Sequence, residues 1–233
     1  MSANLFNDCI RWLCWIYECR SLLPRLSNER ENMSWIEVVA DKDATGRLKA
    51  LYDKIRSSDG SLDHIMMAHS LRPHTMEAHM MIYKYVLYHS GNKIPSWFLE
   101  SLGSYVSSLN GCTYCTAHHF GAIFTQLNDN NRSLSICGAI SADDPSHAFD
   151  GKELEAMKYA RALTLEQRSV NEGHVQRLRE AGYSDGEILE INQVVSYFGY
   201  ANRMVMGIGV STRGETVGLA PSDSDNPDDW GHV

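Results

Sequence analysis

The hydrophobic positions from residue 43 onward recur every three to four residues, which is the period of an amphipathic α-helix. Leu48, Leu51 and Ile55 form one such stripe, while Pro73 and Pro95 stand where a proline is tolerated, in the first turn of a helix. No stretch combines strict alternation with the β-branched residues typical of a strand. The pattern predicts an all-α protein with helices over about 43–57, 62–69, 73–89, 95–110, 112–127, 133–140, 150–163, 170–181 and 185–209.

Local sequence signals predict one helix end and three helix starts more closely. Asn110-Gly111 is a turn signal that ends one helix and opens the next. Two stretches have the capping-box pattern of a serine followed three residues later by a glutamate, and they predict the starts of the last two helices. They are Ser169-Val-Asn-Glu172 and Ser184-Asp-Gly-Glu187.

The pattern also divides the chain into three parts. Residues 1–32 have little helical rhythm, and we interpret them as an extension that is either not native or poorly ordered; the alternative is a short helix that packs on the domain. Residues 33–212 form the helical domain. Residues 213–233 are polar and acidic, which predicts a loose tail.

Composition narrows the class of protein. The chain has 233 residues, 43% of them hydrophobic and 21% charged, with a formal net charge of −8. No run of Lys or Arg is present, so we expect neither a nucleic acid nor a membrane as partner. The apolar run Trp12–Tyr17 is too short for a signal peptide, which favours a cytoplasmic location, where close cysteine pairs are more often catalytic or metal-binding than structural.

The candidate chemistry lies in SSLNGCTYCTAHHF, residues 107–120. On a helix, the turn of about 100° per residue puts Cys112, Cys115 and His119 on one face and His118 well off it. The preceding turn places Cys112 at or near a helix N-terminus, where backbone N–H groups and the helix dipole stabilise a thiolate.

Three interpretations of this motif are open. A zinc site needs three or four ligands, and no second cysteine pair of this spacing is present to complete it. Two buried structural cysteines would leave the histidine without a role. A redox dithiol uses every feature, because two close sulfurs can form a disulfide and a base lies one turn away. The histidines at five-residue steps do not change this, because Pro73 interrupts them, and we expect them to be surface or half-buried residues: His64, His69, His74 and His79.

The wider pattern resembles a known family. Its elements are Glu100-x11-Cys112-x2-Cys115-x3-His119, AHSLRP at 68–73 and YFGYANRMVMGIGV at 197–210. Over about residues 35–212 the chain resembles the AhpD-like alkylhydroperoxidases of the carboxymuconolactone decarboxylase superfamily, closest to their peroxidase-related branch. The resemblance implies a multi-helix bundle, a homo-oligomer, no cofactor or metal, a peroxide substrate and an unknown thiol reductant.

It also implies roles for individual residues. Cys115 would be the peroxidatic cysteine, Cys112 its proton donor and resolving partner, and His119 with Glu100 the relay that keeps Cys115 deprotonated. Tyr114 and His118 would be supporting residues, with Tyr114 standing where the best-studied members have a second histidine. The alternative is a non-peroxidatic thiol-disulfide reductase or redox-responsive module, whereas lactone decarboxylation does not depend on the cysteine pair and is disfavoured.

Overall fold

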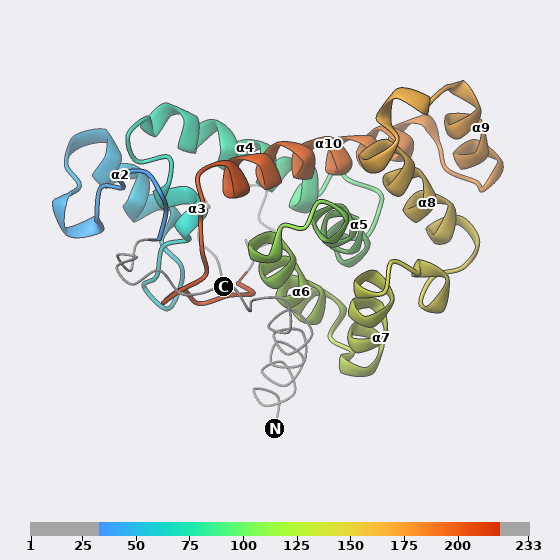
Figure 1. Cartoon of the computed structure of the whole chain (residues 1–233), viewed down its shortest axis with the longest axis horizontal. Coiled ribbons are helices and arrows are strands. Elements are labelled where there is room, and N and C mark those ends of the chain that lie inside the picture. The colour runs from blue at the N-terminus through green and yellow to red at the C-terminus, as the bar shows by residue number, and fades with distance from the viewer. Residues whose placement is uncertain (1–32, 220–233) are drawn as a thin grey trace, which may run out of the picture. The chain divides into compact units, whose positions relative to one another are not determined.

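The computed structural model describes residues 33–219, and this part of the chain contains helices and no strand, which confirms the all-α prediction. The predicted extension 1–32 and residues 220–233 lie outside the described residues. Figure 1 shows the helices in chain order: α2 (Gly46–Ile55), α3 (His64–Met67), α4 (Pro73–Tyr88), α5 (Ser96–Leu109), α6 (Thr113–Leu127), α7 (Asn130–Ser141), α8 (Gly151–Leu165), α9 (Glu172–Glu180) and α10 (Asp185–Gly207), with short 3-10 turns at Asp41–Asp43, Pro145–His147 and Gln167–Ser169. No described helix has both the length and the apolar character needed to cross a membrane.

Helix α5 is the centre of the domain. Every residue from Phe98 to Ser107 is buried, as expected of a helix surrounded by other elements, and α5 packs mainly on α6, α10 and α8 (Figure 1). The contact with α10 requires a glycine, because a Cβ atom on Gly103 would lie 2.1 Å from the ring of Phe198. The close approach of α5 and α10 therefore depends on a missing side chain.

The turn between α5 and α6 positions the cysteine motif. Gly111 adopts φ of +72°, and its N–H bonds to the carbonyl of Ser108 while the N–H of Cys112 bonds to the carbonyl of Ser107. These two bonds form a Schellman motif, in which a left-handed glycine ends the helix. Cys112 then becomes the N-cap residue of α6, as the sequence predicted.

Most predicted helices are found within a few residues of their expected ends, but two starts are wrong. Helix α9 is capped by a box of Asn171 and His174, while Ser169 lies in the preceding 3-10 turn. The box predicted at Ser169 fails because Asn171, two residues later, is the better-placed cap. Helix α7 begins at Asn130 rather than near 133, because the Asp129 side chain accepts a hydrogen bond from the N–H of Arg132 at 3.1 Å.

The chain after α10 returns to the start of the described domain. The N–H of Trp35 bonds to the carbonyl of Ile208 at 2.8 Å, and the N–H of Ser211 bonds to the carbonyl of Met33 at 3.0 Å. The two ends of the described chain are thus held together by backbone hydrogen bonds.

The same C-terminal segment lies against α6. A Cβ atom on Gly121 would be 2.2 Å from the Cα atom of Gly218, so the two backbones touch at these glycines. The side chain of Glu215 is only 1% exposed. The expectation of a loose tail from residue 213 onward is therefore wrong for Glu215, which is buried because its carboxylate has partners inside the domain, while the division of the chain at 32 and 212 stays a prediction.

Candidate active site at the cysteine pair

The two cysteines of the motif lie side by side as free thiols. Their Sγ atoms are 2.7 Å apart, and the residues are 1% and 3% exposed for Cys112 and Cys115. A disulfide bond is shorter, at about 2.05 Å, so the sulfurs are close without being bonded. The predicted juxtaposition of the two thiols is present in the structure.

The pKa values of the pair shift in opposite directions. The hydrogen bond shared with Cys115 lowers the pKa of Cys112 against the effect of burial, and the side chain of Asn202 also lowers it. Burial, followed by the influence of Cys112, raises the pKa of Cys115 well above its usual range. These directions favour the first negative charge on Cys112, whereas the family resemblance implied a deprotonated Cys115; the physical reason is that the shared hydrogen bond stabilises one thiolate and disfavours a second charge beside it.

His119 and Glu100 meet as the sequence predicted. Nδ1 of His119 lies 2.7 Å from Oε2 of Glu100, which is fully buried on α5, and the hydroxyl of Tyr88 donates to the other oxygen, Oε1. A carboxylate with this geometry fixes the orientation and tautomer of an imidazole. Tyr88 is an additional member of the network that no sequence signal indicated.

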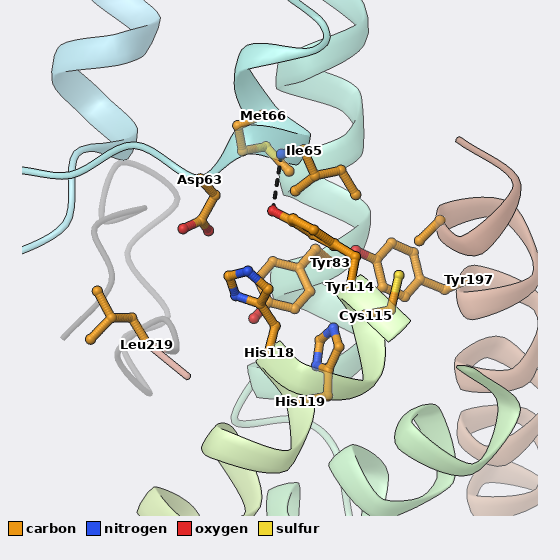
Figure 2. A pocket seen from close by; sticks show the side chains of 11 residues that line it. Asp63, Ile65, Met66, Tyr83, Tyr114, Cys115, His118, His119, Tyr197 and Leu219 are labelled. Atoms are coloured by element: carbon orange, nitrogen blue, oxygen red, sulfur yellow. Dashed lines mark hydrogen bonds between the residues drawn. The ribbon is translucent and has the colours of Figure 1, made fainter. Parts of the chain in front are cut away.

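A small cavity of about 40 Å³ opens beside the pair (Figure 2). It is lined by Cys115 and by both histidines of the motif, but not by Cys112. His118, which lies off the helical face of Cys112, Cys115 and His119, also lines the cavity, because the cavity wall extends around α6 farther than one helical stripe. The lining residues are Asp63, Ile65, Met66, Tyr83, Tyr114, Cys115, His118, His119, Tyr197, Ala201 and Leu219.

Tyr114 directs its hydroxyl away from the sulfurs toward a carboxylate. Its OH donates to Oε1 of Glu215 at 2.7 Å and accepts a hydrogen bond from the N–H of Ile65 at 3.1 Å, drawn as a dashed line in Figure 2. Burial and the charge of Glu215 raise the pKa of Tyr114 well above its usual range. In this environment Tyr114 is a hydrogen-bond donor and not a base.

Asn202 was missed by sequence reasoning. Its Nδ2 donates to Oγ of Ser107 at 3.0 Å, and its Oδ1 accepts from Nδ2 of Asn110 at 2.9 Å. It is fully buried on α10 beside Cys112, whose pKa it lowers. One signal could have indicated it, namely an asparagine within the otherwise apolar stripe of the last helix.

Three of the four evenly spaced histidines are buried, which corrects the expectation that they lie at the surface or half-buried. His64, His69 and His79 are at most 8% exposed, and His74 is exposed as expected. Nε2 of His79 lies 3.1 Å from the hydroxyl of Tyr197, and burial lowers its pKa to about 3. A buried neutral imidazole with a hydrogen bond is a structural group, and its burial follows from the packing of α4 on α10.

No family model matches the chain, and no curated protein matches its sequence at a significant level. Solved structures do share its fold. A peroxidase-related protein from Ralstonia eutropha JMP134, described as an alkylhydroperoxidase AhpD core, superimposes with a TM-score of 0.69 at 16% identity, covering 78% of this chain and 93% of that one.

Two further solved structures agree. A peroxidase-related protein from Silicibacter sp. TM1040 gives a TM-score of 0.64 at 16% identity and covers 80% of this chain and 95% of its own. The debrominase Bmp8 superimposes with a TM-score of 0.61 at 18% identity, and the match covers 78% of this chain and 92% of the debrominase. The chain therefore has the AhpD-like all-α fold that the sequence resemblance implied.

Proposed function

We propose that this chain is a dithiol peroxidase that reduces hydrogen peroxide or organic hydroperoxides. The observation that carries the proposal is the pair of free thiols 2.7 Å apart, with Cys115 at the wall of a cavity that His119 also lines. The likeness of the fold to peroxidase-related proteins supports the same class of activity. The small cavity suits a small peroxide group.

The proposed reaction has two steps, reduction of the peroxide by Cys115 and formation of the disulfide with Cys112. The Cys115 thiolate attacks one oxygen of ROOH, the O–O bond breaks, Cys115 becomes a sulfenic acid and RO⁻ leaves as ROH after gaining a proton. Cys112 then attacks the sulfenic sulfur, forms the Cys112–Cys115 disulfide and releases water. The peroxide gains two electrons and the dithiol loses two; an external thiol reductant must return them.

Proton movement decides the rate of the first step. The shared hydrogen bond offers a path for the Cys115 proton to reach the Cys112 thiolate, which leaves the nucleophile on the sulfur that faces the cavity. The leaving oxygen is a strong base, since water has a pKa of about 15.7, and it needs an acid. His119, held by Glu100, is placed to supply that proton, an effect typically worth about 10²–10⁴ in rate.

A single-turnover experiment tests this proposal. The protein is reduced, freed of reductant and mixed with hydrogen peroxide or an organic hydroperoxide, and mass spectrometry locates the product. We expect a Cys112–Cys115 disulfide to form much faster than a free thiol of matched pKa reacts with peroxide. Cys115→Ser should abolish turnover, and Cys112→Ser should stop at one sulfenate per chain. Cys137→Ser is the matched control, because Cys137 is a buried cysteine on α7 and has no place in the mechanism.

One observation favours a second function, a thiol-disulfide reductase without peroxidase activity. Burial raises the pKa of Cys115, the sulfur at the cavity, which would slow its attack on peroxide. The likeness to a debrominase fits this alternative too, since that name describes an activity other than peroxide reduction. The alternative predicts that the disulfide forms with peroxide only at the speed of a free thiol, but forms rapidly by exchange with a disulfide substrate.

A further inference from the structure

We propose that Asp63, His118 and Glu215 form a binding site for a divalent transition-metal ion of the zinc class. The site lies at the part of the cavity wall farther along α6 from the cysteine pair, and none of its residues takes part in the proposed dithiol reaction. Its three ligands come from the N-cap of α3, from α6 and from the segment after α10.

The strongest evidence is a pair of buried atoms without hydrogen bonds. Oε2 of Glu215 and Nε2 of His118 have no hydrogen-bond partner, although both are buried. They face each other at 3.4 Å. Leaving such atoms unsatisfied is unfavourable, and Nδ1 of His64, 3.5 Å from the same Oε2, is already engaged by the carbonyl of Ser211 at 2.7 Å. Two ligand atoms bound tetrahedrally to one zinc ion, at about 2.0–2.1 Å each, are about 3.3 Å apart, so this spacing suits a shared metal ion.

Asp63 supplies a third ligand atom. Its carboxylate oxygen, the His118 nitrogen and the Glu215 oxygen all lie within 4.8 Å of one another. Figure 2 shows the Asp63 carboxylate and the His118 ring on the same side of the cavity. With Asp63 the site has three protein ligands, which leaves a fourth position for water, the arrangement of open zinc sites.

The surrounding residues hold Glu215 in place. Its other oxygen, Oε1, accepts hydrogen bonds from the hydroxyl of Tyr114 at 2.7 Å and from the backbone N–H of His64 at 2.6 Å. Nδ1 of His64 in turn contacts the carbonyl of Ser211 at 2.7 Å, on the same segment as Glu215. Such outer partners orient a ligand before the ion binds, which is typical of metal sites.

The ligand set indicates the class of ion. One imidazole nitrogen with two carboxylates suits Zn²⁺ and its neighbours, whereas Ca²⁺ and Mg²⁺ prefer six or more oxygen ligands, several of them water for Mg²⁺. The two carboxylates also match the two positive charges of the ion. Binding would join α3, α6 and the C-terminal segment, and the open position would face the cavity that Cys115 lines.

Zinc titration of the full chain tests the proposal. Thiolates also bind zinc, so the titration uses a cysteine-free variant, in which all six cysteines are replaced by serine and the result does not depend on the peroxidase proposal. We expect one Zn²⁺ per chain near neutral pH, measured by calorimetry or chelator competition. Tyr114→Phe, which removes an outer partner, should weaken binding by about 10–100-fold. Glu215→Gln and His118→Asn, which remove ligands, should weaken it more.

The matched control is His147→Asn. His147 also faces an acid, with Nδ1 3.0 Å from Asp144, but this pair is exposed at the surface and has no third ligand in the described residues. Its replacement should leave zinc affinity unchanged. Circular dichroism of each variant separates a lost ligand from a lost fold.

Three results would overturn the proposal. The first is the absence of stoichiometric zinc binding to the unmodified protein, which would assign the space between His118 and Glu215 to a proton. The second is zinc affinity that is the same in Glu215→Gln as in its parent. The third is a thiolate-to-metal charge-transfer band when Co²⁺ is added to the unmodified, reduced protein together with loss of binding in the cysteine-free variant, which would place the ion on the cysteines.

Discussion

Cys112 and Cys115 behave as one titrating unit, because a hydrogen bond joins their sulfurs and each influences the other's pKa. The sulfur with the lowered pKa and the sulfur at the cavity are different atoms. In the proposed peroxidase reaction, the lowered pKa therefore favours the resting thiolate on Cys112, whereas the thiolate that attacks the peroxide is that of Cys115. Burial and the hydrogen bond to Cys112 raise the pKa of Cys115, whereas the same hydrogen bond lowers the pKa of Cys112.

We expect the pair to lose its two protons in well-separated steps. The first thiolate should appear below the pKa of a free cysteine, about 8.5, because the pKa of Cys112 is lowered, and the second only far above it. Thiolate absorbance in the ultraviolet, followed against pH in a variant whose other four cysteines (Cys9, Cys14, Cys19 and Cys137) are serine, measures both steps.

Cys112→Ser isolates the second cysteine in this experiment. This variant should lose the deprotonation step that occurs at the lower pH, since Cys115 alone keeps a pKa raised by burial. If the deprotonation at the lower pH persists in Cys112→Ser but disappears in Cys115→Ser, the first thiolate would instead be that of Cys115.

Glu100 should act on O–O cleavage through His119 and not on the thiols themselves. Glu100→Gln keeps the size of the side chain but removes the charge that orients the imidazole. We expect the rate of disulfide formation with peroxide to fall by about 10²–10⁴, the usual contribution of a positioned acid. Formation of the same disulfide by exchange with oxidised glutathione needs no such acid and should change little. An equal loss in both reactions would show that Glu100 has only a structural role.

At the scale of elements, the hairpin of α5 and α6 places the catalytic candidates. The turn at Asn110–Cys112 lies midway between Glu100 and His119, and two antiparallel helices joined there bring these residues level with each other. The same turn makes Cys112 an N-cap. The position of α10 against this hairpin depends on Gly103, where the ring of Phe198 occupies the space of a side chain.

Gly103→Ala should therefore destabilise the fold. A methyl group would overlap the fully buried Phe198, and overpacking of this kind typically costs about 1–3 kcal/mol of unfolding free energy. Gly138→Ala is the control, because a Cβ atom at this exposed position of α7 meets nothing within 4 Å. Alanine should stabilise that helix by about 0.5–1 kcal/mol. Urea unfolding of both variants measures the difference, and a stabilised Gly103→Ala would refute the close approach of α5 and α10.

At the scale of the whole molecule, segments far apart in the sequence meet around one cavity. Asp63, the motif on α6 and the segment after α10 all contribute to its surroundings. The described surface also carries large exposed apolar side chains on α4, namely Met81, Ile82 and Tyr85, which are 40–48% exposed. Apolar clusters of this kind are typical of interfaces between subunits.

We predict that the protein is a homo-oligomer that uses this face of α4. Ile82→Asp, which puts a charge at the centre of the cluster, should shift the mass in light scattering toward the monomer. Leu189→Asp is the matched control, because Leu189 is 56% exposed on a different helix, α10. A monomeric parent protein would contradict the prediction, and so would an unchanged mass for Ile82→Asp.

The sequence by itself determined the features that depend on short stretches of chain. Helical periodicity located the helices, the glycine turn located the N-cap cysteine, and the spacing from Glu100 to His119 placed them on facing helices. These features follow from local backbone geometry. The start of α9 was misplaced because Asn171, two residues after Ser169, is the better-placed cap, and the start of α7 because Asp129 caps that helix three residues earlier than predicted.

Only the tertiary structure decided which groups are buried together. It buried three histidines that were expected to be surface or half-buried and brought His118 to the cavity. It also set Glu215 and Asp63 beside His118 from 97 residues and 55 residues away in sequence (215 − 118 and 118 − 63). It also set the opposite directions in which the pKa values of the two cysteines shift. These outcomes depend on desolvation and on contacts between distant segments, and no local pattern encodes either.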